Sequence, residues 1–472
     1  MPMRLHDTMT RSLRAVEPFE SDHVRLYTCG PTVYARAHIG NFRTFLFEDV
    51  LRRWLERRFA RVTHVMNLTD VEDKIIRNAT AANHDLDAET GPWITAFFDD
   101  LDTLNIRRAH HYPRATEYIA EMVALIERLD AVGVTYRSDD SVYFHITSFP
   151  PYGRLSGVRA EGLVAGAGGR VDADEYEKED ARDFALWKTV AADEIGWDTK
   201  LGRGRPGWHI ECSAMSMALL GESFDIHCGG VDNIFPHHEN EIAQSEAASG
   251  KPFVQLWCHG EHLRVGGDKM AKSLANFATV ADLVSSGARP SALRYLLIAG
   301  AHYRKPVNYS DESLHGATES VGRFADFADR IRAHAPTDAA GSGSADSRVA
   351  TARAAFEAAM DDDLNLPEAM GAVYTLIRAL NRELDGGAVD GPTHMELAAL
   401  IDEVDDVLGV LPLVERERAE AQLSAPEKAA FVAREAARAA RDWAEADRLR
   451  DDLARMGVAV EDTPGGQRWR RL

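Results

Sequence analysis

Runs of apolar residues and their spacing predict a parallel sheet in the first part of the chain. An apolar run at residues 24–28 is followed by a turn, and apolar residues then recur at helical spacing from Phe42 to Leu55. A second strand-like run covers residues 61–69. Because strand, helix and strand in this order form a βαβ unit, the pattern predicts an α/β fold whose ligands bind at the carboxyl ends of parallel strands.

The middle of the chain is expected to interrupt this sheet. Helical spacing covers residues 115–129, and residues 134–146 alternate like a hairpin that turns at 138–141. A glycine-rich, charged stretch without periodicity follows at 153–180. We interpret the whole region as an insertion, after which the sheet resumes at 207–215.

The rest of the chain completes the sheet and then becomes helical. Residues 224–230 form a strand-like run, and Pro236 is well placed to open the next helix. From about Ser310, alanines and heptad-like apolar positions predict a helical domain. A last module combines one predicted helix over residues 427–456 with a short apolar run and a basic tail at 465–471.

Composition narrows the class of protein. The 472 residues are 45% hydrophobic, enough for several cores, and no apolar run approaches the roughly 18 residues that a membrane helix needs, so we expect a multidomain cytoplasmic protein. A formal net charge of −21 disfavours non-specific binding to polyanions, so a nucleic acid would have to meet local basic patches. The 4 cysteines are too few for a disulfide framework, which leaves burial, reactivity or metal binding.

The turn between the first strand and its helix has the features of an anion site. Residues 29–41 carry His38 just before the helix, whose N-terminal N–H groups attract phosphate. Far downstream, Lys269 and Lys272 lie in a glycine-rich loop and could neutralise a pyrophosphate leaving group. Together they predict nucleotidyl transfer from ATP without a P-loop. By contrast, residues 202–207 match the dinucleotide pattern only in a turn that no strand precedes, and we expect no nucleotide there.

A second group of residues has the chemistry of a metal site. His237 and Glu241 stand four positions apart on one face of the predicted helix, and Cys29 and Cys212 are each expected at a strand end. Two thiolates, an imidazole and a carboxylate make a tetrahedral donor set that prefers zinc. From the residues alone, four others remain possible ligands: Cys228, Cys258, His238 and Glu239.

Together these motifs resemble the cysteinyl-tRNA synthetases, a family of class I aminoacyl-tRNA synthetases. The resemblance runs almost from end to end and is carried by residues 29–34, 38–41, 67–70, 183–188, 207–215, 235–245, 269–273, 301–304, 360–365 and 469–471. Two positions depart from the class I pattern. Asn41 replaces a histidine, which this family accepts, and Ala271 replaces a serine of the lysine motif.

The resemblance implies the site residues and their roles. Zinc would be held by Cys29, Cys212, His237 and Glu241 and would take the cysteine sulfur as a thiolate, so that serine is rejected without a separate editing site. The amino acid pocket would be formed by Thr69, Trp208, His209 and His227. ATP, accompanied by Mg²⁺, would be bound by His38, Gly40, Asn41, Gly229, Gly230, Asp232, Lys269, Lys272 and Ser273, of which His38, Asn41, Lys269 and Lys272 would be catalytic.

The resemblance also implies the domain order and the partners. The expected parts are a Rossmann-like catalytic domain in two halves, 1–112 and 201–260, a connective insertion at 113–200, a dilysine-loop and stem-contact region at 261–309, a helical tRNA-binding domain at 310–415 and an anticodon-recognition module at 426–472. Contacts with tRNA are expected at Trp443, Asp447, Arg468, Trp469 and Arg470. The partners would be tRNA(Cys), L-cysteine and ATP, with no membrane, and the chain is expected to act as a monomer.

Two other functions compete with this interpretation. The cysteine ligase of mycothiol synthesis resembles the same catalytic core but joins cysteine to an amino sugar, and it should lack the module at residues 426–472. A non-catalytic tRNA-binding relative should have lost His38, the two lysines or the metal ligands, all of which are present. The sequence therefore favours the synthetase.

Overall fold

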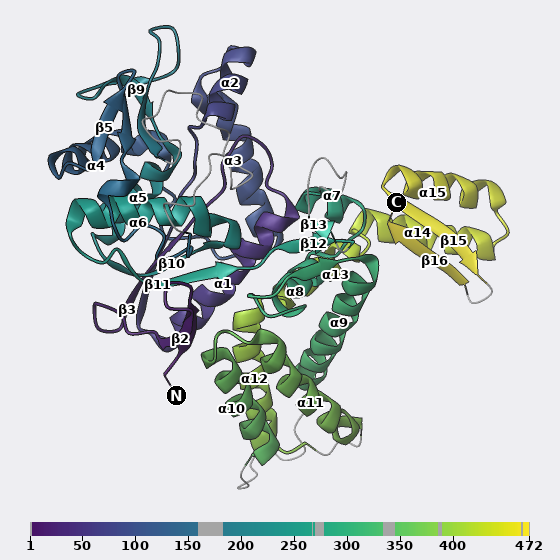
Figure 1. Ribbon diagram of the computed structural model, residues 1–472. Coiled ribbons are helices and arrows are strands. Elements are labelled where there is room, and N and C mark those ends of the chain that lie inside the picture. The colour runs from purple at the N-terminus through teal and green to yellow at the C-terminus, as the bar shows by residue number, and fades with distance from the viewer. Residues whose placement is uncertain are drawn as a thin grey trace. The chain divides into compact units, whose positions relative to one another are not determined.

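The computed structural model describes residues 2–158, 183–266, 268–269, 278–333, 345–385, 389–463 and 466–471 (Figure 1). The chain divides into two compact units, Met1–Val410 and Leu411–Leu472, which are considered separately. Among the described helices, none combines the length and the apolar character that a membrane crossing requires.

The first unit is built on a four-stranded parallel sheet. Its strands lie in the order β11 (Val254–Gly260), β10 (Phe224–Gly230), β3 (His23–Thr28) and β4 (Arg61–Met66). The pairing of β3 with β10 joins the two halves of the sheet across the insertion. α1 (Ile39–Arg58) connects β3 to β4, and α6 (Glu239–Ser249) lies between β10 and β11, as parallel pairing requires. The predicted α/β class with a parallel sheet is confirmed.

The remaining strands of this unit form three smaller sheets. They are a hairpin of β1 (Arg4–Asp7) and β2 (Ser12–Ala15), a five-stranded sheet in the order β5 (Thr135–Ser138), β6 (Ser141–Phe144), β7 (Phe184–Thr189), β9 (Gly202–Pro206) and β8 (Trp197–Thr199), and a sheet of β13 (Asp268–Lys269), β12 (Leu263–Val265) and β14 (Val307–Tyr309). The predicted hairpin at 134–146 is confirmed by β5 and β6. The glycine-rich stretch at 153–180 lies mostly outside the described residues.

Residues 202–206 form a strand and not the turn that the glycine pattern suggested. β9 pairs with β7 on one side and with β8 on the other, so backbone hydrogen bonds to two neighbours hold it extended despite its glycines. A strand paired on both sides leaves no loop that could wrap a phosphate.

Helices cover the sheets and form the rest of the first unit. They are α2 (Asp73–Ala82), α3 (Leu86–Thr103), η1 (Ala115–Tyr118), α4 (Ile119–Ala131), η2 (Ile146–Ser148), α5 (Trp208–Leu220), η4 (Val231–Asn233), η5 (Ile234–His238), α7 (Val280–Ser285), α8 (Pro290–Ala299), α9 (Asp311–Ala333), α10 (Ser347–Asp361), α11 (Leu366–Asp385) and α12 (Gly391–Leu408). The helix expected at 115–129 is confirmed as η1 and α4. The helices expected from about residue 310 are confirmed as α9 to α12.

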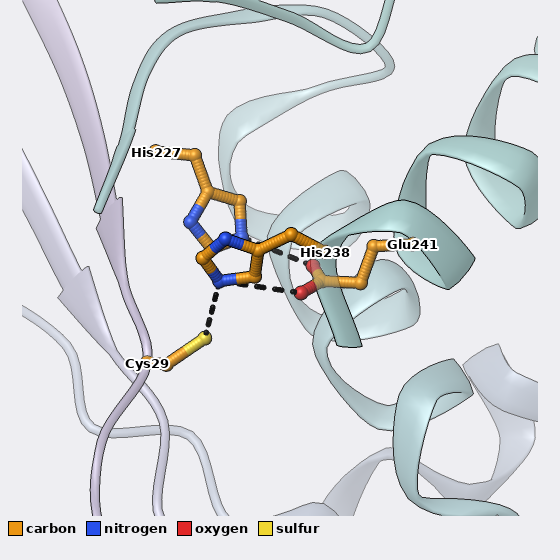
Figure 2. A group of neighbouring side chains, drawn as sticks. All are labelled: Cys29, His227, His238 and Glu241. Carbon is orange, nitrogen blue, oxygen red and sulfur yellow. Dashed lines mark hydrogen bonds and ion pairs between the residues drawn. The ribbon is translucent and has the colours of Figure 1, made fainter. Parts of the chain in front are cut away.

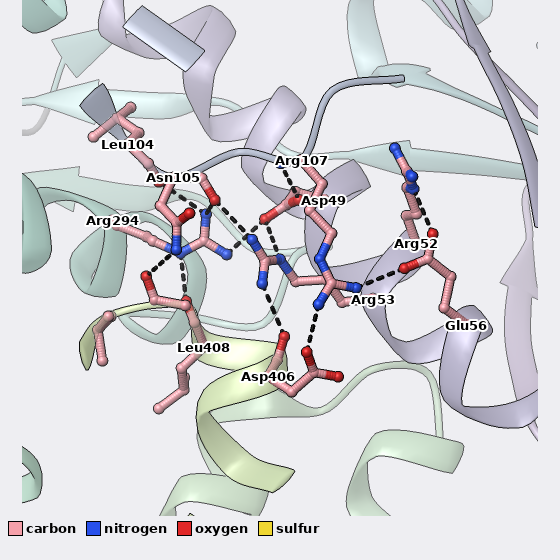
Figure 3. Close-up of polar contacts among 12 residues, drawn as sticks. Asp49, Arg52, Arg53, Glu56, Leu104, Asn105, Arg107, Arg294, Asp406 and Leu408 are labelled. Atoms are coloured by element: carbon pink, nitrogen blue, oxygen red, sulfur yellow. Dashed lines mark hydrogen bonds and ion pairs between the residues drawn. The ribbon is translucent and has the colours of Figure 1, made fainter. Parts of the chain in front are cut away.

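A buried polar network holds α1 against α8 and the end of α12 (Figure 3). The carboxylate of Asp49 in α1 accepts hydrogen bonds from Arg294 of α8 at 2.6 Å and from Arg53 at 2.8 Å. Arg294 also donates to the backbone carbonyl groups of Leu408 and, at 3.0 Å, of Asn105. Because Asp49 and Arg294 are both fully buried, this network joins segments that are distant in the sequence through charged groups shielded from water.

The second unit contains α13 (Leu411–Ala421), α14 (Ala425–Ala439), α15 (Trp443–Arg455), β15 (Val458–Thr463) and β16 (Gly466–Arg471). The single helix predicted over residues 427–456 is wrong, because the chain breaks between α14 and α15. Arg441 has a φ of 61°, and the side chain of Asp442 accepts the N–H of Glu445 at 3.1 Å and so caps a new helix. The basic tail is a strand as well, since β16 pairs with β15.

Candidate active site and metal centre

The four predicted metal ligands meet at the carboxyl end of β3. Cys29 follows β3, Cys212 lies in α5, His237 lies in η5, and Glu241 lies in the first turn of α6. One ligand atom from each side chain lies within 4.8 Å of the others. The structure therefore brings together side chains from three segments that are far apart in the sequence, around Cys29, around Cys212 and at 237–241.

We expected Cys212 at a strand end, but it lies inside α5. This helix begins directly after Gly207, whose backbone approaches β7 so closely that a Cβ atom would lie 1.9 Å from the carbonyl oxygen of Ala185. Residues 210–216 are all buried, so their pattern has no alternation that separates a strand from a helix. Gly207 is the N-cap of α5, so the helix has already begun before Cys212 is reached.

The contacts of the four alternative ligands show which of them belong to a possible metal site. Glu239 uses both carboxylate oxygens to accept backbone N–H groups, from Gly153 and Ser156, each at 2.8 Å. Cys228 and Cys258 are partners in the register of β10 and β11, and neither belongs to a ligand group found among the described residues. His238 does belong to one. Together with Cys29, His227 and Glu241 it forms a second group that overlaps the first (Figure 2).

Glu241 shows where a cation fits. Its Oε2 accepts a hydrogen bond from Nε2 of His227 at 3.0 Å, whereas its buried Oε1 has no hydrogen-bond partner among the described residues. Nε2 of His237 lies 3.1 Å from that Oε1. A buried carboxylate oxygen without a donor is costly, and a cation between the four ligands would satisfy it.

His237 and His238, one from each of the two overlapping ligand groups, are both neutral, which is the state in which an imidazole binds a metal. Burial lowers the pKa of His237 to about 3 and holds the pKa of His238 well below its usual value. Both rings are therefore neutral near pH 7 and keep a lone pair. The contact with Cys212, together with burial, raises the pKa of the Cys29 thiol. A bound cation would favour the thiolate instead.

Three of the four residues expected in the amino acid pocket surround this cluster. The ring of Trp208 lies 4.6 Å from that of His237, measured between centroids, and Nδ1 of His209 lies 3.0 Å from Nδ1 of His237. The ring of His227 contacts Glu241 through Nε2, as described above. Thr69 lies on the adjoining turn, where its N–H donates to the carbonyl of Pro31 at 3.1 Å. Trp208 itself is 41% exposed to solvent.

Of the residues expected to bind ATP, His38, Gly40 and Asn41 lie at the N-terminus of α1, and Gly229, Gly230 and Asp232 lie at the carboxyl end of β10. Nδ1 of His38 accepts the N–H of Asn41 at 3.2 Å, and Oδ1 of Asn41 accepts the N–H of His38 at 3.1 Å, so the two side chains cap α1 reciprocally. Gly40 follows in the first turn of α1. Gly230 ends β10, and Asp232 follows in η4.

Gly229 has a packing role that the sequence did not indicate. A Cβ atom there would lie 2.9 Å from Cε1 of His238, so only glycine lets this ring lie against β10. On the lysine loop, the backbone of Lys269 belongs to β13, but its side chain and all of Lys272 and Ser273 lie outside the described residues.

The residues expected to contact tRNA lie in the second unit. Trp443, the first residue of α15, is 58% exposed, and Asp447 pairs with Arg450 at 3.2 Å. Trp469 in β16 is paired in register with Val460. The side chains of Arg468 and Arg470 lie outside the described residues. Contacts between these residues and tRNA stay predictions.

The fold and the site define a class I aminoacyl-tRNA synthetase. The family described as "tRNA synthetases class I (C) catalytic domain" matches residues 15–319, and "DALR domain" matches residues 355–412. Methionyl-tRNA synthetase of Mycobacterium tuberculosis in complex with methionyl-adenylate has the same fold, with a TM-score of 0.59 and 15% sequence identity over 83% of this chain and 90% of that one.

Full-length relatives narrow the class to one family. Cysteine--tRNA ligases of Protochlamydia amoebophila and Solibacter usitatus are 45% and 46% identical to this chain, covering 100% of it and 98% and 100% of their own lengths. "Cysteinyl-tRNA ligase anticodon binding domain" matches residues 420–470. The chain belongs to the cysteine–tRNA ligase family.

Proposed function

We propose that this protein activates L-cysteine with ATP and transfers it to the 3′ end of tRNA(Cys). The observation that carries the proposal is the convergence of Cys29, Cys212, His237 and Glu241 at the carboxyl end of β3. The connection that follows β3 ends at His38, which caps the N-terminus of α1, a helix end suited to phosphate. Family membership, with relatives aligned over the whole chain, supports the same activity.

The metal of this centre is proposed to be Zn²⁺, held by Cys29, Cys212, His237 and Glu241. Two soft sulfur donors favour zinc over harder divalent ions, and Oε1 of Glu241, which accepts no hydrogen bond from the described residues, supplies a hard donor for the fourth position. When bound, zinc supplies a Lewis acid that prefers a thiolate to the hydroxyl of serine. The overlapping group lacks Cys212 and has one sulfur, which makes it the weaker zinc site of the two.

The side chains around the centre would bind and orient cysteine. Trp208, His209 and His227 line the cluster, and Thr69 lies on the neighbouring turn, so these side chains would enclose the amino acid. The carboxylate oxygen then attacks the α-phosphorus of ATP, the bond to the β-phosphate breaks, and pyrophosphate leaves. Holding both reactants in this geometry supplies much of the rate enhancement.

Charge stabilisation would come from two sides of the nucleotide. His38, Gly40 and Asn41 present the N-terminus of α1 to the α-phosphate, while Lys269 and Lys272 neutralise the departing pyrophosphate, which Mg²⁺ accompanies as part of the substrate. Gly229, Gly230, Asp232 and Ser273 are proposed to complete the ATP site. The 2′-hydroxyl of the terminal ribose of tRNA then takes the cysteinyl group from the adenylate, which releases AMP.

The second unit is proposed to read the anticodon, with Trp443 and Trp469 stacking on bases and Asp447, Arg468 and Arg470 making polar contacts. The domain boundaries given above and a monomeric state remain part of this proposal.

One assay tests the function. Cysteine-dependent exchange of pyrophosphate into ATP measures activation, and trapping the product with tRNA(Cys) or with an amino sugar measures transfer. We expect exchange followed by transfer to tRNA. Absence of exchange would overturn the enzymatic assignment, and transfer to the sugar alone would identify the ligase of mycothiol synthesis, against which the match at residues 420–470 already argues.

A further inference from the structure

A chain of hydrogen bonds runs from the N-terminal hairpin to the sulfur of Cys29. Oγ1 of Thr8 lies 2.7 Å from Nδ1 of His259, and Nε2 of His259 lies 2.8 Å from Nδ1 of His238. Nε2 of His238 lies 3.3 Å from Sγ of Cys29. Figure 2 shows the last of these contacts, with the ring of His238 between Cys29 and Glu241. Both histidines are buried, so the hydrogen bonds between their rings are shielded from water.

Thr8 is held in place by the backbone and not by its own side chain. Its N–H donates to the carbonyl of Trp257 at 2.8 Å, and the carboxylate of Asp7 accepts the N–H of Trp257 at 3.1 Å. The turn after β1 is therefore fastened to both backbone groups of one residue of β11, Trp257, two residues before His259. The hydroxyl of Thr8 is therefore available to form its hydrogen bond with the imidazole of His259.

The ring of His238 has little freedom of its own. It lies 5.1 Å from the ring of Trp257 and 4.4 Å from that of His227, measured between centroids, and Gly229 provides the space for one of its edges. Packing fixes the plane of the ring, but it does not determine which of the two nitrogens carries the hydrogen. That choice depends on the hydrogen bonds that the two nitrogens make.

The groups at the two ends of this series of hydrogen bonds determine which atom donates in each of them. A metal-bound thiolate at Cys29 can only accept, so Nε2 of His238 must donate and its Nδ1 must accept. Nε2 of His259 must then donate to His238, which leaves Nδ1 of His259 as an acceptor for a hydroxyl hydrogen. Among the four side chains of this series, Thr8 can donate its hydroxyl hydrogen to Nδ1 of His259 without first accepting a hydrogen from another group.

We propose that Thr8 is a positioning residue of the metal centre: its hydroxyl fixes, through His259, the N–H that His238 donates to the sulfur of Cys29. The proposal rests on the zinc assignment made above. An N–H donated to a metal-bound thiolate holds the ligand in its orientation and spreads its charge. Thr8 thereby links an N-terminal hairpin, which contains no metal ligand, to the retention of the metal.

The test compares the full-length chain with three variants, each loaded with Zn²⁺ alone. Thr8→Val removes the hydroxyl and keeps the shape, Thr8→Ser restores it, and Thr10→Val changes a neighbouring hydroxyl whose contact is with Ser12 at 2.9 Å on the exposed side of the turn. Release of zinc to a chromogenic chelator should be about tenfold faster in Thr8→Val, at the low end of the effect of outer-shell substitutions. Thr8→Ser and Thr10→Val should match the unsubstituted chain.

A spectroscopic readout separates positioning from a general loosening of the fold. In the Co²⁺-loaded chain, Thr8→Val should shift the sulfur-to-cobalt charge-transfer band, which a change of stability alone does not move. If Thr8→Val does not fold, His259→Asn retains a polar group facing Thr8 but cannot reach His238, and should give the same shift.

Wild-type release rates and an unshifted band in both variants would overturn the proposal. Failure of the unsubstituted chain to retain zinc would overturn the zinc assignment itself, and the proposal with it. That outcome is recognised without any variant.

Discussion

Asp49 and Arg294 form an ion pair at 2.6 Å in which both side chains are completely buried. Burial alone would raise the pKa of Asp49, but the charges of Arg294 and Arg53 outweigh this effect and lower that pKa. Asp49 is therefore charged at neutral pH. Since α1 also presents His38 at its N-terminus, the pair anchors the helix that faces the proposed ATP site.

Replacing Arg294 by methionine should destabilise the first unit strongly. The substitution leaves a buried carboxylate with one guanidinium partner fewer, and breaking a buried pair in this way costs about 3–5 kcal/mol. Urea unfolding of the full chain, followed by tryptophan fluorescence, measures the change. Arg348→Met is the control, because Arg348 pairs with Glu383 at 2.8 Å on the surface, and it should leave the unfolding midpoint unchanged. Equal midpoints for the two variants would contradict a structural role for the buried pair.

Cys212→Ser should remove zinc while the chain remains folded. The serine occupies the same space in α5 but offers a poor ligand, so zinc affinity should fall by more than about 100-fold, beyond the effect of losing an outer-shell contact. Metal analysis after dialysis and cysteine-dependent pyrophosphate exchange should fall together. Normal zinc content in this variant would instead assign the metal to the overlapping group of Cys29, His227, His238 and Glu241.

Glu241 and Glu239 are adjacent acidic positions with different predicted roles, and they form a matched pair of substitutions. Glu241→Gln should lose zinc, because a neutral amide is a much weaker zinc ligand than the carboxylate, whose Oε1 accepts no hydrogen bond from the described residues. Glu239→Gln should keep zinc, because its oxygens bind the N–H groups of Gly153 and Ser156 and not the cluster. It should instead weaken the attachment of that segment, measurable as faster proteolysis near residue 153. Loss of zinc from Glu239→Gln would contradict this division.

The sequence predicted the sheet and the gathering of the ligands because both follow from local rules. The order strand, helix, strand implies parallel pairing, and parallel strands present their carboxyl ends together, which is where Cys29 lies. The spacing of His237 and Glu241 placed both on one face, although the first lies in η5 and the second in α6. No local rule placed Cys212, because a run of buried residues has no period from which to choose between strand and helix.

Contacts between distant segments account for most of what the sequence did not predict. His259 stands at the carboxyl end of β11, a position that the strand-end rule does indicate, but its partner Thr8 lies in a hairpin with no spacing relationship to it. The break at Arg441 was missed for another reason. Residues 427–456 keep helical spacing on both sides of it, and the capping aspartate Asp442 is a weak signal inside a long helical pattern.

His64 should make the first unit less stable as the pH falls. Burial, with Arg52 and His110 nearby, lowers its pKa to about 3 from the usual 6.5. The unfolded chain takes up this proton near pH 6.5 and the folded chain only near pH 3, so acid between these values favours unfolding by about 1.4 kcal/mol per pH unit. The stabilising contribution of neutral His64 is thus complete above pH 6.5 and is lost on acidification.

His64→Gln removes this titration and isolates it from that of the other buried histidines. Between about pH 7.5 and 5.5, the variant should lose about 1.4 kcal/mol less stability than the unsubstituted chain in urea unfolding. Its stability at the higher pH should be lower, because the contact of Nε2 with Oγ1 of Thr28 at 3.0 Å is changed. Parallel pH profiles for the two proteins would show that His64 is not the group that titrates.

Asp442→Ala should affect the second unit and tRNA binding but not cysteine activation. The side chain of Asp442 caps α15, and loss of such a cap costs about 1 kcal/mol. The turn that would fray begins with Trp443, which is 58% exposed and is our proposed stacking residue. If Trp443 contacts a base, the KM for tRNA should rise by up to about fivefold, the equivalent of 1 kcal/mol, while pyrophosphate exchange stays unchanged. Glu435→Ala on the exposed face of α14 is the control, and an unchanged KM in both variants would place the tRNA contact elsewhere.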